Sequence, residues 1–207
     1  MGSLVENAIQ RSIDAVIKRD RNAAQEVLDS EQRINSIELE IDALAIDLLA
    51  LHQPMASNLR FIIAALKINS NLERMGDLSV VIAHSARALI ESPAIEPMVD
   101  IPYIAGIVQS MVRTSLDAFV SADVDLARSV LASDDAVDNL RTTCFHQLVS
   151  FMQKDPQNIN PALNLLTVTR TLERLADHST NIAEDVLFFV SGVDVRHSGG
   201  DGTANPR

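Results

Sequence analysis

One sequence motif occurs twice in this chain, and it restricts the fold more than any other feature. Residues 72–77 read LERMGD, and residues 172–177 read LERLAD. The match continues downstream through Ser79 and Ser179, and a second, weaker match joins residues 13–35 to residues 116–138. Self-similarity over most of a chain is typical of a duplicated structural unit. The sequence therefore predicts two related halves with the same order of elements.

Helical periodicity dominates both halves. Apolar residues at 59, 62, 63, 66 and 68 follow the i, i+3, i+4 pattern of a helix with one buried face. Prolines interrupt the pattern. Pro54 and Pro161 are predicted to occupy the first turns of helices. We predict an all-α chain with six helices, three in each half. Their expected ranges are 3–19, 22–51, 54–91, 99–121, 124–153 and 158–191.

The predicted boundaries follow from this pattern. Residues 1–95 would form the first three-helix bundle and residues 96–192 the second. Residues 193–207 have no periodicity and many small polar side chains, so we expect a disordered tail. The difference in spacing between the two matches indicates that the connection between the second and third helices differs in length between the halves.

Composition excludes several classes of function. The chain has 28 acidic and 17 basic residues and a net charge of −11, which argues against nucleic acid and against direct contact with anionic lipid. A single cysteine, Cys144, excludes an internal disulfide and a thiolate zinc cluster. The longest apolar runs, such as residues 61–66, are too short to span a membrane. No signal peptide is recognisable, so we expect a cytoplasmic protein.

The repeats carry acidic residues four apart, which share one face of a helix. These pairs are Glu73 with Asp77, Glu173 with Asp177, and Asp134 with Asp138. A chain with this many acids would contain about four such pairs by chance, and Glu38 with Asp42 has no counterpart in the second half. The matched register of the other pairs favours a metal site of carboxylate oxygens, which suit hard divalent cations. The competing interpretation is a solvated acidic face with Arg74 and Arg174 in ion pairs.

Two stretches resemble the PhoU family of phosphate-transport regulators. One is residues 53–77, QPMASNLRFIIAALKI followed by LERMGD after three residues, and the other is LERLADHSTNIAE at 172–184. The resemblance extends to about Gly192. It implies two three-helix bundles related by a pseudo-twofold axis, each with a multinuclear cluster of iron, zinc, manganese or magnesium.

The resemblance also implies which residues hold these metals. The second site would use Asp134, Asp138, Glu173 and Asp177. The first would use Glu31, Glu73 and Asp77, with Asn35 where the family pattern has an aspartate. Because an amide offers only a neutral oxygen, we expect the first site to bind metal more weakly than the second.

By the same resemblance, the expected function is negative regulation of phosphate uptake and of the phosphate-starvation two-component response. Such a protein bridges the ATPase of the phosphate ABC transporter and a sensor histidine kinase, reaches the membrane only through these partners, and is not an enzyme. Relatives continue upstream of this first helix, so the helix here is expected to be truncated, with dimerisation through the apolar surface left uncovered.

Two alternatives stay open at this stage. One is a metal-free helical adaptor in which the repeat serves packing alone. The other, a carboxylate-bridged metal oxidase, needs Glu-x-x-His motifs, and no glutamate in the sequence has a histidine three residues later.

Overall fold

The computed structural model describes residues 1–92 and 99–192. The predicted disordered tail and most of the connection around Pro93–Pro97 lie outside these residues. Within them, the chain is helical and contains no strand, which confirms the all-α prediction. The helices are α1 (Gly2–Lys18), α2 (Arg21–His52), α3 (Ser57–Glu91), α4 (Ile101–Ser121), α5 (Val124–Leu131), α6 (Asp134–Lys154) and α7 (Ile159–Ser191), with a short 3₁₀ turn at Pro156–Asn158.

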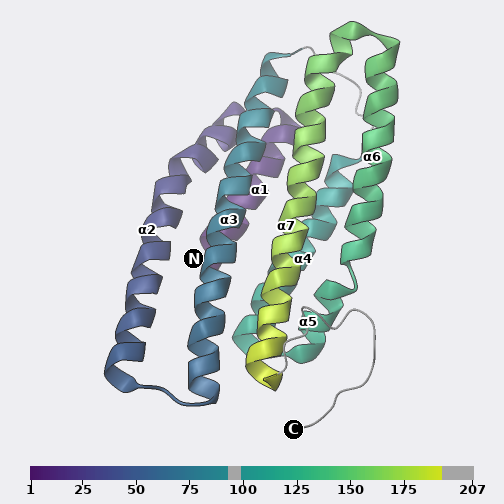
Figure 1. Ribbon diagram of the computed structural model, residues 1–207. Coiled ribbons are helices and arrows are strands. Elements are labelled where there is room, and N and C mark those ends of the chain that lie inside the picture. Colours follow the sequence, from purple (N-terminus) through teal and green to yellow (C-terminus); the bar gives the residue numbers. More distant parts are fainter. Residues whose placement is uncertain (93–98, 193–207) are drawn as a thin grey trace.

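Four long helices form one layer in the order α2, α3, α7, α6, and α1, α4 and α5 pack behind it (Figure 1). Helix α1 packs on α2 and α3, and α4 and α5 pack on α7. The arrangement is two three-helix halves joined along α3 and α7, as the repeat predicts, with the second helix of the second half divided into α5 and α6.

The predicted single helix over 124–153 is wrong because the chain leaves the helix between α5 and α6. Ser133 N–H donates to the carbonyl of Val130 at 3.0 Å, which closes a tight turn. The Ser133 hydroxyl also donates to the carbonyl of Ser129 at 2.9 Å. Serine and aspartate compete for backbone hydrogen bonds in this way, so the run Ser133-Asp134-Asp135 favours a new helix start.

A second correction concerns the start of α3, which begins at Ser57 rather than at Pro54. Gln53 and Ala56 both have positive φ, at 44° and 50°. These left-handed conformations end α2 and hold residues 54–56 outside both helices. The other predicted boundaries agree with the structure to within two residues, and Pro161 does lie in the first turn of α7.

Helices α3 and α7 are antiparallel and meet at the middle of each motif. Arg60 Nε donates to the carbonyl of Phe189 at 3.3 Å, and Lys67 Nζ lies 3.2 Å from the Asp185 carboxylate. Met75 and Leu175, the central residues of the two motifs, are both fully buried. The largest cluster of buried residues includes side chains of both halves, so the two repeats share one hydrophobic core.

Candidate functional site

The first acidic patch lies between α2 and α3. Asn69 on α3 donates to the Glu38 carbonyl at 3.0 Å and to the Asp42 carboxylate at 2.9 Å, which fixes the register of the two helices. Two turns further along α3, a Cβ on Gly76 would lie 3.1 Å from the Ile34 side chain. Glu73 and Asp77 therefore face the part of α2 that carries its acidic residues. A Cβ at this position would require the Ile34 side chain to shift by a few tenths of an ångström.

The electrostatics of Glu73 identify its neighbours. Burial raises the pKa of Glu73, and the charges of Asp77 and Glu38 raise it further, whereas Arg74 lowers it. Arg74 lies 3.5 Å from Glu73 and 3.6 Å from Asp77, as the competing interpretation expected of Arg74. The first patch therefore has fewer positive than negative charges.

Sequence reasoning missed Glu38 as a member of this patch. It set aside the pair Glu38 and Asp42 because the second half has no counterpart. Residues 31, 35, 38 and 42 nevertheless follow one face of α2, which is the face turned towards α3 and solvent. That spacing was a usable signal. The predicted ligand Glu31 lies further along this face, beyond the contact of Ile34 with Gly76.

The second acidic patch lies between α6 and α7 and contains all four predicted residues. Burial raises the pKa of Asp134, and so do the charges of Asp177 and Asp138 and, more weakly, of Glu173. Burial and the Asp177 charge raise the pKa of Glu173, and burial and the Asp138 charge raise that of Asp177. These mutual effects indicate that the four carboxyl groups lie in one patch.

The two patches differ in one position that matters for charge. In the repeat alignment, Arg141 of α6 stands where α2 has Glu38, and Arg141 lies 3.7 Å from Glu173. The second patch thus has an arginine at a position where the first patch has a carboxylate. This difference opposes the effect of Asn35, so the predicted order of metal affinity stays a prediction.

The donor chemistry of the patches suits a hard divalent cation, because carboxylate oxygens are its preferred ligands. A metal site also needs its ligands to be gathered around one point. Among residues 1–92 and 99–192, no group of three or more Asp, Glu, His or Cys side chains is arranged to hold one ion. The acids are close enough to repel one another, yet they are not gathered around a common point.

The raised carboxyl pKa values predict how stability depends on pH in the absence of metal. A carboxyl whose pKa is higher in the folded than in the unfolded chain penalises folding when it is ionised. That penalty is complete at neutral pH and is relieved as the pH falls towards the unfolded values of 3.8 for aspartate and 4.5 for glutamate. The patches should therefore make the chelated chain gain stability on mild acidification.

Thermal melts in EDTA, compared with the variant Asp134→Asn with Asp177→Asn, isolate this effect. The variant should melt higher at neutral pH and gain less on acidification, by about 0.5 kcal/mol per removed repulsion. His178 acts in the opposite direction in both proteins. Burial lowers its pKa below 6.5, and so do Arg174 and Arg74, so its protonation destabilises the fold on acidification. Parallel pH profiles for the two proteins would contradict the prediction.

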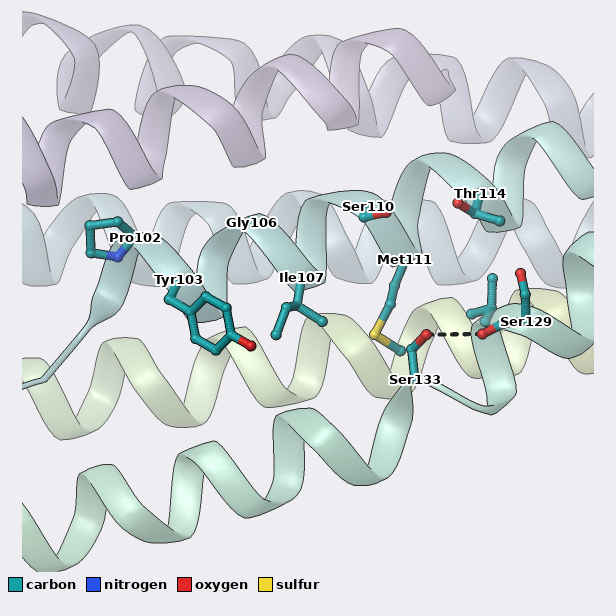
Figure 2. A pocket seen from close by; sticks show the side chains of 10 residues that line it. Pro102, Tyr103, Gly106, Ile107, Ser110, Met111, Thr114, Ser129 and Ser133 are labelled. Carbon is teal, nitrogen blue, oxygen red and sulfur yellow. Dashed lines mark hydrogen bonds between the residues drawn. The ribbon is translucent and has the colours of Figure 1, made fainter.

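One open pocket beside α4 is distinct from both patches. Figure 2 shows this cavity of about 470 Å³, whose labelled side chains come from α4, from α5 and from the turn between α5 and α6. Its lining includes Tyr103, Ser110, Met111 and Ser133, and contains no acidic, basic or histidine residue. It therefore has neither the charge nor the ligands expected of a metal or acid–base site.

With this geometry established, comparison with known proteins identifies the family. The model of the PhoU domain matches the chain twice, at residues 1–86 and 101–186. The chain belongs to the PhoU family. The two matches coincide with the two halves of the internal repeat.

Named relatives support this assignment. The PhoU homologue of Pseudomonas aeruginosa, named a phosphate-specific transport system accessory protein, is 42% identical over 96% of this chain and 83% of its own length. The similarly named protein of Aquifex aeolicus is 38% identical over 95% of this chain and 89% of its own length. Both names describe an accessory protein rather than an enzyme.

Solved PhoU structures share the fold. The crystal structure of PhoU from Pseudomonas aeruginosa has a TM-score of 0.88 at 40% identity, and covers 93% of this chain and 92% of that one. The phosphate transport system regulatory protein PhoU from Streptococcus pneumoniae has a TM-score of 0.86 at 26% identity, with 94% and 91% covered. None of the helices described here is long and apolar enough to cross a membrane.

Proposed function

We propose that this chain is a cytoplasmic, non-catalytic accessory protein of a phosphate-specific transport system. In this role it would restrain phosphate uptake and repress the phosphate-starvation two-component response when phosphate is plentiful. The observation that carries the proposal is the similarity to named accessory proteins over 96% of the chain. The double match to the PhoU domain supports it.

The proposed partners are the ATPase of the phosphate ABC transporter and the sensor histidine kinase of the same system. The names of the relatives support association with the transport system. The layer of α2, α3, α7 and α6 offers a broad surface for such contacts. The predicted homodimer stays a prediction, which sedimentation equilibrium of the full chain tests.

The proposal includes metal ions at the two acidic patches. Asp134, Asp138, Glu173 and Asp177 would hold them in the second patch, and Glu31, Glu73 and Asp77 in the first. Glu38 joins the first patch because its charge raises the pKa of Glu73. A bound cation would supply positive charge where the carboxyl groups now raise one another's pKa values. The side chains themselves would move closer together on binding, which would stiffen the α2–α3 and α6–α7 pairs.

The metal-free adaptor remains the second candidate function. The absence of a converged group of three ligands within the described residues favours it. It predicts the same partners, and it differs in that chelation would leave their binding unchanged.

Deleting the gene in its own host tests the proposed function. At plentiful phosphate, the deletion strain should express a phosphate-starvation reporter at least ten-fold above the parent strain, and the reintroduced gene should restore repression. Purified transporter ATPase and kinase should each retain the purified chain, and an unrelated ABC ATPase should not. Unchanged reporter expression together with no retention by either partner would contradict the proposal.

A further inference from the structure

The cavity beside α4 has the size of a small-molecule site. Its volume of about 470 Å³ lies within the range of about 300–1,000 Å³ that is typical of such sites. Tyr103, Ile107 and Met111 extend from the same side of α4, and Ser129 and Ser133 border the cavity from α5 and from the turn after it (Figure 2). We call the cavity lined by these residues the α4–α5 pocket.

The internal repeat gives a reason why this pocket is open. In the first half, Arg11 of α1 lies 3.0 Å from Glu26 of α2, and this ion pair joins the two helices. The repeat aligns Thr114 of α4 with Arg11, and it aligns Ser129 of α5 with Glu26. Two short hydroxyl side chains therefore stand where the first half has two long charged ones, and both line the pocket. The open space follows from a specific difference between the halves.

The pocket has buried apolar side chains in its lining and an exposed aromatic ring beside them. Met111 and Val130 are 3% and 1% exposed, whereas Tyr103 is 57% exposed. A tyrosine ring stacks on flat aromatic rings, and a thioether sulfur makes favourable contacts with the edges of such rings. Tyr103 and Met111 therefore favour a planar aromatic ligand.

Hydroxyl groups supply the hydrogen bonds that the lining side chains can offer. Ser129 donates to the Leu126 carbonyl at 2.7 Å and Ser133 donates to the Ser129 carbonyl at 2.9 Å, so both hydroxyl oxygens keep lone pairs that can accept. The hydroxyls of Ser110 and Thr114 bond to none of the residues that the structure describes, so each can donate or accept. The pocket suits a ligand that has both donors and acceptors on its edges.

The lining also carries no charge, because it contains no acidic, basic or histidine residue. A phosphate or carboxylate group that entered the pocket would lose its hydration without meeting a cation. The net charge of −11 opposes anions further. These features favour an uncharged ligand.

We propose that the α4–α5 pocket binds a neutral nucleoside, with the base between the Tyr103 ring and Met111. Nucleobases combine a planar aromatic ring with hydrogen-bond donors and acceptors on their edges, and they stack on aromatic side chains. The serine and threonine hydroxyls would bond to the edges of the base and to the ribose. The proposal goes beyond the phosphate-transport role and does not depend on it.

Titration of the full chain with nucleosides tests the proposal. The probes are adenosine, guanosine, cytidine and uridine, and the binding is followed by calorimetry. At least one should bind with a Kd of about 100 μM, which is the affinity expected from the usual binding free energy per non-hydrogen atom. The 5′-monophosphate of that nucleoside should bind at least ten-fold more weakly, because its phosphate meets no cation. A monophosphate that binds as tightly would overturn the requirement for a neutral ligand.

The double variant Thr114→Arg with Ser129→Glu copies the ion pair of the first half into the second. The longer side chains should fill the pocket and weaken nucleoside binding at least ten-fold, and circular dichroism should show that the variant stays folded. The matched control is Asn139→Glu with Thr143→Arg. It adds the same two charges to the exposed surface of α6, outside the pocket, and should leave the affinity unchanged.

Tyr103 provides a second test, which does not depend on the folding of the double variant. Tyr103→Ala should weaken nucleoside binding at least five-fold, because it removes the ring on which the base stacks. Tyr103→Phe keeps the ring and should keep most of the affinity. Since Tyr103 is largely exposed, both variants should melt at the same temperature as the parent chain.

Three further results would overturn the proposal. The first is that none of the four nucleosides binds. The second is that a nucleoside binds equally well to the parent chain, to the double variant and to Tyr103→Ala, since its site would then lie elsewhere. The third is that N-acetyltryptophanamide binds more tightly than every nucleoside and loses its affinity in the double variant, since the pocket would then receive an aromatic side chain of a partner protein.

Discussion

Lys67→Thr is expected to destabilise the chain by about 2–3 kcal/mol, because it removes the cation beside a buried carboxylate. Asp185 is only 3% exposed, and Lys67 Nζ lies 3.2 Å from it and 5.4 Å from the centre of the Phe188 ring. Lys67 itself is partly exposed, which keeps the expected cost below that of a fully buried pair. Urea unfolding at neutral pH measures the difference in the free energy of unfolding.

The internal repeat supplies the control for this prediction. The repeat aligns Lys67 of α3 with Thr167 of α7, and it aligns Asp185 of α7 with Ser85 of α3. The double variant Lys67→Thr with Asp185→Ser copies that pair and removes both charges, so it should recover most of the stability that the single variant loses. A single variant within 0.5 kcal/mol of the parent would show that the buried carboxylate does not depend on Lys67.

Removing two carboxylates of the second patch is expected to weaken metal binding there at least 100-fold. Glu173→Gln with Asp177→Asn leaves neutral oxygens in place of two of the four carboxylates that a cation would bridge. Manganese and zinc titrations of the chelated chain, followed by calorimetry, measure the affinity. The variant should also stay folded by circular dichroism, because the removed charges repel one another.

The matched control removes the same two charges elsewhere. Asp117→Asn with Asp125→Asn changes exposed side chains on α4 and α5, outside both patches, and should leave the affinity unchanged. If both double variants lost the same metal affinity, the binding would be a general effect of net charge and not of a site in the second patch. A chelated parent chain that binds neither metal would favour the metal-free adaptor.

Much of the fold could be predicted because the repeat and the helical period act over many residues. The two halves, their three-helix order and most helix ends follow from these patterns. The break at Ser133 could not be predicted in the same way. It depends on a few local hydrogen bonds, and the equivalent part of α2, which contains Ser30 and Glu31, stays helical.

The site residues could be predicted where they share a face of one helix. They could not be predicted where their contact depends on how two helices pack. The spacing of Glu173 with Asp177 and of Asp134 with Asp138 places each pair on one face, and the structure brings the two pairs together. The contributions of Glu38 and Arg141 depend on how α2 and α6 are rotated against α3 and α7. Sequence periodicity leaves that rotation open when a helix has polar residues on several faces.

The junction of α3 and α7 has a consequence for the origin of the chain. Helices that cross antiparallel at the same motif form the kind of isologous contact that joins two identical subunits. A half-length ancestor with this sequence would have buried its central helix only by pairing with itself. The ion pair of Lys67 with Asp185, matched by Thr167 and Ser85 on the other side, requires two different partners. Such asymmetry needs two copies of different sequence, which a pair of identical subunits cannot provide.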